Sequence, residues 1–241
     1  MENEDLILDD SSDRFSYSSI GTYQQCPFKY KLIHVDKHKV KSNTIATYFG
    51  TLVHHTEEVI GNCLKDNTPI DYEKLKKDFH ELNDDENGLY GIDILKQKFT
   101  VDFYTNDKTG KNYQDKSDFY LHTGIYRLED LIKKNPQYKI VGTEVEFLFE
   151  KFGYMFHGFI DRIYYVKDTN TYIIEDIKTY KETIKDDKLD VPLQMVIYTH
   201  ALRNLFNLDE SIKIKCSYDL VLLGQRQIVT NNTYIEDGNK I

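Results

Sequence analysis

Helical patterns dominate the first quarter of the chain. Ser16 and Ser18 can cap a short helix that carries Ile20, and Pro27 breaks it. A longer helix is predicted over 44–64, because apolar positions recur there every three or four residues and so share one face. These positions are Ile45, Tyr48, Phe49, Leu52, Thr56, Val59, Ile60 and Cys63. We expect that face to point into a core.

The next segment, 65–138, is polar and charged, and it predicts a helical insertion rather than part of a core. Its expected helical patches and loops cover 72–82, 92–103, 119–134, 83–88 and 106–112. Residues 1–14 are acidic and rich in Ser and Asp, which indicates a disordered tail. The prediction is therefore a single domain over 15–241 with one insertion.

From residue 139 the pattern becomes that of strands. Runs rich in β-branched and aromatic residues predict strands over 139–149, 154–166 and 172–177. A helix opened by Pro192 follows over 191–206, and then strands are expected over 211–223 and 225–235. Helices, a three-stranded meander, a helix and a further strand together predict an α/β or α+β layered fold.

Composition sets the broad class of protein. A chain of 241 residues with 40% apolar and 29% charged side chains is typical of a soluble globular domain. No apolar run approaches the length of a signal-peptide core or a membrane span. The three cysteines are far apart and form no CxxC pair, so we expect no disulfide framework and a cytoplasmic location.

The net charge of −9 argues against an ordinary nucleic-acid binder, which neutralises phosphates with a basic surface. That objection weakens if acidic residues surround divalent cations, because the metal then supplies the positive charge. Basic residues do cluster near the start of the chain, either as a solvated face or as a phosphate contact: Lys29, Lys31, Lys37, Lys39 and Lys41.

The predicted hairpin brings two aspartates together. If Val166 pairs with Thr171, the same register places Asp161 opposite Asp176. Like charges in a cross-strand pair are destabilising, and a hard divalent cation between them would compensate. Side chains alternate along a strand, so Lys178 shares a face with Asp176.

Such a site is suited to phosphodiester hydrolysis. Carboxylates would hold a metal that lowers the pKa of a bound water and neutralises the phosphate, and the lysine would orient or activate that water. The alternative is that Asp161, Arg162, Asp176 and Lys178 form ordinary hairpin ion pairs.

Six segments, in order, resemble the motifs of RecB-like PD-(D/E)XK nucleases, the branch that includes the CRISPR-adaptation nucleases. Gly158–Arg162 and Ile174–Thr179 resemble the G-x-I-D-R and D-x-K-T motifs that form its signature. Phe15–Ile20, continued by Tyr23 and Cys26–Tyr30, resembles its opening segment. The remaining matches are a G-T-x-x-H helix at Phe49–His54, an acidic strand residue at Glu144 and a Q-x-x-x-Y helix at Gln194 and Tyr198.

The resemblance implies a mixed central sheet with helices on both faces and a site for Mg²⁺ or Mn²⁺. The implied metal ligands are His54, Asp161, Asp176 and the carbonyl of Ile177, with Lys178 as the catalytic lysine. Gln194 and Tyr198 would form hydrogen bonds near the lysine or the DNA. Glu144 would bind a metal directly or through water, with Glu146 as its rival. The helical pattern by itself favours His55 over His54 for the inner face.

Some members of this family hold a [4Fe–4S] cluster through one early and three late cysteines. Cys26 matches the early position, but Cys216 is the only late cysteine. We therefore expect no cluster and interpret Cys26 as a small buried side chain.

The resemblance implies a divalent-metal-dependent deoxyribonuclease, and we expect an exonuclease of recombination, replication or repair. The alternatives are a structure-specific endonuclease and a non-catalytic nucleic-acid-binding subunit. Expected partners are single-stranded DNA or duplex ends and a helicase or recombinase, in the cytoplasm of a bacterium or a phage-infected cell and without a membrane. Candidate nucleic-acid contacts are Ser18, Tyr23, Lys29, Tyr30, Arg162 and Thr179.

Overall fold

The structure is a computed structural model, and it describes residues 14–38, 45–75, 105–106, 111–112, 132–180, 193–222, 232–236 and 239–240. The predicted tail up to residue 13 and the predicted helix over 92–103 lie outside these residues. Within the predicted insertion, 72–75 and 132–134 are helical. Strands β2 (Thr105–Asn106) and β3 (Lys111–Asn112) form a short antiparallel pair at the two ends of a predicted loop.

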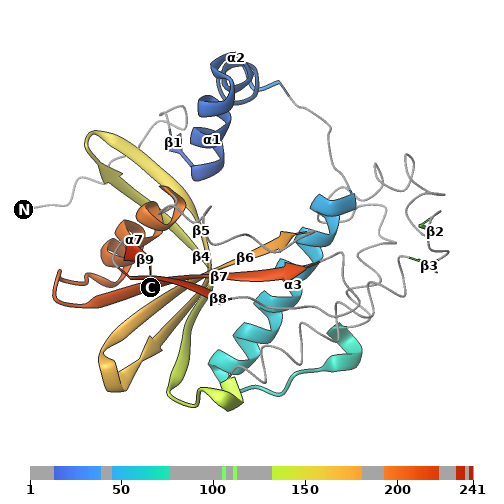
Figure 1. Cartoon of the computed structure of the whole chain (residues 1–241), viewed down its shortest axis with the longest axis vertical. Coiled ribbons are helices and arrows are strands. Elements are labelled where there is room, and N and C mark those ends of the chain that lie inside the picture. Colours follow the sequence, from blue (N-terminus) through green and yellow to red (C-terminus); the bar gives the residue numbers. More distant parts are fainter. Residues whose placement is uncertain are drawn as a thin grey trace, which may run out of the picture.

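A mixed sheet forms the centre of the molecule (Figure 1). The predicted meander is confirmed: β4 (Tyr138–Lys151), β5 (Tyr154–Val166) and β6 (Thr171–Tyr180) are antiparallel neighbours. The turn between β5 and β6 is a short 3₁₀ helix, Lys167–Thr169, that ends at Asn170 in the left-handed region.

The sheet continues on both sides of the meander. Strand β7 (Lys213–Leu222) lies parallel to β6, and β8 (Asn232–Glu236) and β9 (Asn239–Lys240) follow in antiparallel order. Strand β1 (Arg14–Phe15) pairs in parallel with β5. Arg14, the last residue of the predicted tail, therefore belongs to the sheet.

The predicted N-terminal helix is α1 (Tyr17–Gln25), and its start follows from the sequence. Ser16 is the N-cap and forms a capping box with Ser19, so two free backbone N–H groups gain partners. The predicted break at Pro27 is confirmed, because α1 ends at Gln25 and Cys26 is extended. Pro27 also begins the next helix. It occupies the first turn of α2 (Pro27–Tyr30), where its missing N–H costs nothing, and η1 (Lys31–Val35) continues from there.

Two longer helices cover opposite faces of the sheet (Figure 1). The first, α3 (Ile45–Asp66), contacts β4, β5 and β6. The second, α7 (Leu193–Phe206), contacts β4 and β7. The layered arrangement implied by the sequence is confirmed. Among the described residues, no helix combines the length and the apolarity that crossing a membrane would require.

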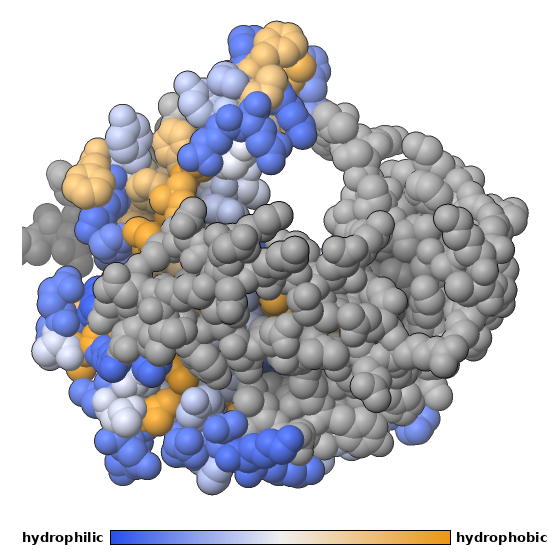
Figure 2. Space-filling model, viewed as in Figure 1, coloured by the Kyte–Doolittle hydropathy of each residue, from blue (hydrophilic) through white to orange (hydrophobic). Residues whose placement is uncertain are grey.

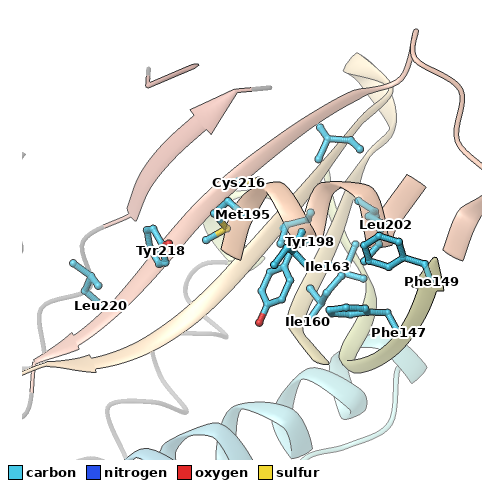
Figure 3. Packing of buried hydrophobic residues seen from close by; sticks show 14 residues of the cluster. Phe147, Phe149, Ile160, Ile163, Met195, Tyr198, Leu202, Cys216, Tyr218 and Leu220 are labelled. Atoms are coloured by element: carbon cyan, nitrogen blue, oxygen red, sulfur yellow. The ribbon is translucent and has the colours of Figure 1, made fainter. Parts of the chain in front are cut away.

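The main hydrophobic core lies between α7 and the sheet (Figure 3). Met195, Tyr198 and Leu202 of α7 pack against strand residues that include Phe147 and Ile160. Because α7 presents residues spaced by three and four positions, a single face of it reaches the sheet. This core fixes the helix that carries Gln194.

The face of the sheet under α3 is different. Its apolar cluster is small and consists of Val53, Ile177 and Val221. Beside this cluster lies the buried guanidinium of Arg162, which is 1% exposed. Gly61 brings α3 close to β4, because a Cβ at that position would lie 2.6 Å from the side chain of Thr143. This close approach sets the position of α3 over the strands.

Candidate active site

Asp161 lies where two strands part. One edge of β5 pairs with β6 over Arg162–Val166 and with β1 at Met155–Phe156. Asp161 lies between these two ladders, and its Oδ2 accepts a hydrogen bond of 2.6 Å from the backbone N–H of Ile177. A side-chain carboxylate thus serves as acceptor for an N–H of the neighbouring strand. The second carboxylate oxygen is left to other partners.

The predicted register is confirmed, with one correction. It holds from Thr171 to the pair of Arg162 and Glu175, where the ladder between β5 and β6 ends. The next predicted pair, Asp161 opposite Asp176, is not part of the ladder, because the Asp161 carboxylate takes the Ile177 N–H instead. The two aspartates are close enough for the charge of Asp161 to affect Asp176, but they do not form a regular cross-strand pair.

Three elements bring metal-ligating atoms together at this point. Nδ1 of His54, on α3, lies 3.5 Å from Oδ1 of Asp161 and 3.5 Å from Oε1 of Glu144, on β4. The ligand atoms of these three residues all lie within 4.8 Å of one another. His55 points elsewhere, with Nδ1 4.0 Å from Glu58. The motif therefore identified the histidine that reaches the acids, whereas the helical pattern alone favoured the wrong one.

Glu144 reaches this cluster through an unusual backbone conformation. Its φ is +44°, in the left-handed region that side chains other than glycine rarely adopt. The conformation follows a register shift between Ile140 and Gly142 in the pairing of β4 with β5. The irregular backbone breaks the alternation that would have made Glu144 and Glu146 equivalent, and Glu146 is exposed. Glu144 is thus the strand carboxylate that meets His54.

Asp176 is buried beside the cluster and has polar partners on two sides. It is 1% exposed, and its Oδ2 lies 2.7 Å from Nζ of Lys178, as the shared strand face predicts. Nε2 of Gln194 donates a 2.8 Å hydrogen bond to Oδ1 of Asp176 and a 2.9 Å bond to the hydroxyl of Tyr198. Gln194 and Tyr198 are both buried, so in this structure they support Asp176 from α7.

The charges of the site affect one another. Burial and the charge of Asp161 raise the pKa of Asp176 to about 6, against the opposing effect of Lys178. Burial alone would lower the pKa of His54, but hydrogen bonds to Asp161 and Glu144 outweigh it and raise that pKa to about 10. Carboxylates therefore dominate the site, and they favour any cation placed among them.

The donor set fits a divalent cation. Metal–ligand bonds to imidazole nitrogen or carboxylate oxygen are about 2.1 Å, so two ligands of one ion lie at most about 4.2 Å apart. The separations of 3.5 Å from His54 to Glu144 and to Asp161 satisfy this limit. Carboxylate oxygens suit Mg²⁺ and Mn²⁺, and the imidazole favours Mn²⁺. Asp176 is not in this group of three and lies beside it.

The expected nucleic-acid contacts divide into two sets. The expected phosphate contact by Arg162 needs correction. Its guanidinium is buried against Glu57, Glu175 and Asp219 and is not available to a phosphate. Thr179 is partly buried next to Gly50. The other four residues lie on α1 and α2 at or near the surface: Ser18, Tyr23, Lys29 and Tyr30.

Sequence patterns missed the residues that surround Arg162. Its Nε and Nη2 donate to Glu175 Oε2 at 2.8 and 2.6 Å, and Nη1 donates to Glu57 Oε2 at 2.8 Å. Nη2 also lies 3.3 Å from Asp219 Oδ2, and the hydroxyl of Tyr164 donates to Glu175. Two features of the sequence indicated these partners of Arg162. Glu175 faces Arg162 in the predicted register, and Glu57 follows Thr56 on the predicted apolar face.

The cysteines also depart from expectation. All three are free thiols. Cys26 is only partly buried, which corrects its interpretation as a small buried side chain, whereas Cys216 is 4% exposed in the main core. The expectation that no iron–sulfur cluster forms stays a prediction.

Comparisons with known proteins bear on the family and the fold of the chain. A model of the PD-(D/E)XK nuclease superfamily matches residues 14–237. A crystal structure named "Putative exonuclease" from Eubacterium rectale has a TM-score of 0.51 at 14% identity, covering 93% of this chain and 73% of that one. At such identity the likeness shows the fold alone.

Two further comparisons add no argument. The structure named SSO0001 covers 54% of this chain and 59% of its own, at 20% identity and a TM-score of 0.26, which is too low to support a conclusion. A search of curated proteins gave no match.

Proposed function

Because the chain belongs to the PD-(D/E)XK nuclease superfamily, we propose that it is a divalent-metal-dependent deoxyribonuclease. Membership supports nuclease activity, and the metal, the substrate and the mode of cleavage are our proposal. We propose Mg²⁺ or Mn²⁺ as the metal and DNA ends as the substrate. The biological setting we propose is recombination, replication or repair, with a helicase or recombinase as partner and a cytoplasmic location.

The observation that carries the proposal is the convergence of His54, Glu144 and Asp161 within 4.8 Å, next to the ion pair of Lys178 with the buried Asp176. In the alternative reading, Asp161, Arg162, Asp176 and Lys178 form ordinary hairpin ion pairs. That reading fits Asp176 and Lys178, which lie 2.7 Å apart, but not Arg162, which pairs with Glu175 instead of Asp161. It does not account for Asp161, whose charged neighbour is a histidine shared with a second carboxylate.

The chain's own residues have separable roles in this proposal. His54, Asp161 and Asp176, with Glu144 directly or through water and the carbonyl of Ile177, would hold the metal. A divalent cation there would supply positive charge to the phosphate and lower the pKa of the attacking water. Gln194 and Tyr198 would keep the Asp176 carboxylate in place.

Lys178 is the proposed catalytic residue of the chain itself. Its side chain is 33% exposed, whereas that of Asp176 is 1% exposed, so a partly accessible lysine is held by a buried carboxylate. From this position it can donate hydrogen bonds to a phosphate oxygen or to the attacking water. The ion pair fixes where that donor lies.

The helical segment at the N-terminus offers a path for a single strand. Tyr23 is 54% exposed and lies edge-on to Tyr30, with the ring centroids 5.5 Å apart. Phe28 is 67% exposed, and Figure 2 shows apolar surface where this segment projects at the top of the view. Exposed aromatic rings beside Lys29 would stack bases while the lysine contacts phosphate, and Ser18 and Thr179 are further proposed contacts.

A direct test uses end-labelled single- and double-stranded DNA with Mn²⁺ or Mg²⁺. We expect the wild type to release labelled products and Asp176→Ala to be inactive. Asp168→Ala, in the exposed turn at the far end of the same hairpin, is the matched control and should retain activity. Equal behaviour of the wild type and Asp176→Ala would refute the proposal.

Closed circular single-stranded DNA separates exonuclease from endonuclease. An enzyme that requires an end leaves circles intact while it degrades linear strands of the same sequence. Cleaved circles would show an endonuclease. No cleavage of any form, together with no metal binding, would indicate a non-catalytic nucleic-acid-binding subunit.

A further inference from the structure

The buried network around Arg162 ties together the elements that carry the candidate metal ligands. The guanidinium forms ion pairs with Glu57 of α3, Glu175 of β6 and Asp219 of β7. All of these side chains are 3% exposed or less. Its contacts with Glu57 and Glu175 are 2.6–2.8 Å long. The group is planar and presents its N–H donors in a fixed fork, so it sets both distance and direction.

Three members of the network are close neighbours in sequence of three candidate ligands. Arg162 directly follows Asp161, and Glu175 directly precedes Asp176. Glu57 lies three residues after His54, and residues at that spacing are neighbours on a helix surface. A displacement of α3 relative to the sheet would thus move His54 and Glu57 together.

We infer that Glu57 and Arg162 act as positioning residues that hold α3, and with it His54, at the correct distance from Asp161 for metal binding. This inference rests on the proposed function, because it assumes that His54 and Asp161 share a metal. Neither Glu57 nor Arg162 would touch the metal or the substrate. Their effect would pass through His54.

The chemistry of the network favours this role over a general contribution to stability. Burying ions is unfavourable, and well-packed apolar residues of similar volume commonly give equal or greater stability. The remainder of the contact between α3 and the sheet contains such residues, with Val53 packed on Ile177 and Val221. A directional ionic contact at this place fixes a geometry that apolar packing does not specify.

Asp219 provides a matched control inside the same network. It contacts the same guanidinium at 3.3 Å and is equally buried. Its strand, β7, carries none of the candidate ligands. Glu57→Gln and Asp219→Asn both replace one buried carboxylate by a carboxamide against Arg162, but only the first alters the link to the helix of His54.

The test is calorimetric titration of Mn²⁺ into purified, metal-free full-length protein, which needs neither DNA nor activity. We expect Glu57→Gln to weaken Mn²⁺ binding about tenfold, the lower end of the range for residues that orient metal ligands. Asp219→Asn should change it less than about threefold, because no candidate ligand moves with it. Far-UV circular dichroism and thermal unfolding in EDTA check that each variant is folded.

A double-mutant cycle shows whether the effect passes through His54. In a His54→Ala background, Glu57→Gln should no longer weaken the residual Mn²⁺ binding, since the ligand that it positions is absent. Glu57→Asp provides a second variant. It keeps the charge but shortens the side chain. Positioning therefore predicts weaker Mn²⁺ binding than in the wild type, whereas a simple requirement for charge predicts wild-type Mn²⁺ binding.

Several results would overturn the inference. These are equal losses of Mn²⁺ affinity for Glu57→Gln and Asp219→Asn, wild-type affinity in Glu57→Asp, or an undiminished effect of Glu57→Gln in the His54→Ala background. Failure of the proposed function looks different: in that case the wild-type protein itself would bind no Mn²⁺ and cleave no DNA.

Discussion

Two carboxylate clusters meet at neighbouring residues of β5, one around Arg162 and one around Asp161, and they differ in where their positive charge comes from. The inner cluster, Glu57, Glu175 and Asp219, surrounds the guanidinium of Arg162 and is almost inaccessible to solvent. The outer cluster contains Glu144 and Asp161, whose side chains are 27% and 10% exposed. Arg162 contacts Glu57 and the adjacent Asp161 contacts His54, so two adjacent sequence positions serve two different purposes.

The comparison shows how a chain of net charge −9 can be suited to act on a polyanion. The inner cluster has a cation built into the chain, so its geometry is set when the protein folds. The outer cluster has only partial compensation, from His54 and from Lys178 beside Asp176. A cation from solution would complete it and could face a phosphate at the same time.

Removal of the built-in cation should have the largest effect on stability. Arg162→Met leaves three buried carboxylates without their guanidinium, and we expect the free energy of unfolding to fall by about 3–5 kcal/mol. Urea unfolding followed by circular dichroism measures the change. Lys139→Met, at an exposed position on β4, is the control. A loss below about 1 kcal/mol for Arg162→Met would contradict the ionic account of the inner cluster.

Removal of a negative charge beside the outer cluster should act on catalysis and spare stability. Asp176→Asn should reduce DNA hydrolysis more than about a hundredfold, because metal-derived charge stabilisation amounts to several kcal/mol. Its stability in EDTA should be unchanged or higher by up to about 1 kcal/mol, since repulsion from Asp161 is relieved. Unfolding curves and initial rates on the same preparation test both parts. A strongly destabilised Asp176→Asn would remove the contrast between the clusters.

Added metal should stabilise the protein by binding at the outer cluster only. Mn²⁺ at about one hundred times its dissociation constant should raise the free energy of unfolding of the wild type by about 2.7 kcal/mol. His54→Ala should show a much smaller increase at the same Mn²⁺ concentration, because it lacks one candidate ligand. Urea unfolding with Mn²⁺ or with EDTA gives the difference. An equal increase in both proteins would place the binding site elsewhere.

The smallest expected effect concerns the strained residue of the outer cluster. Glu144 has a φ of +44°, so Glu144→Gly should relieve strain and leave stability in EDTA equal or higher by about 1 kcal/mol. Glu146→Gly, in regular strand geometry, should lower stability by about 0.5–1 kcal/mol. The two substitutions should therefore change the free energy of unfolding differently, with a loss only for Glu146→Gly. If both glycine variants are destabilised alike, the backbone at Glu144 is not under strain.

Much of the fold could be predicted because its signals are local. The strand periods gave the β4–β5–β6 meander, and the turn at 167–170 set a register that holds as far as Arg162 and Glu175. Ser16 gave the start of α1 through its capping box. Each of these follows from residues a few positions apart, where backbone geometry allows few arrangements.

The sequence by itself also determined the pairs across the hairpin from Val166–Thr171 to Arg162–Glu175. Its motifs singled out His54, Asp161, Asp176 and Lys178 as site candidates. Only the tertiary structure decided that Asp161 takes the Ile177 N–H where the strands part. It also decided that Glu144 turns toward His54. Likewise, it placed Arg162 among buried acids rather than at the surface.

The reason for this division is physical. Alternation and helical spacing state on which side of an element a residue lies, but they do not state what lies on that side. The partner of Arg162 on α3 is 105 residues away in sequence, and the contact exists only after α3 has packed on the sheet. A pattern read along the chain cannot distinguish a surface arginine from one that meets a distant glutamate in the folded interior.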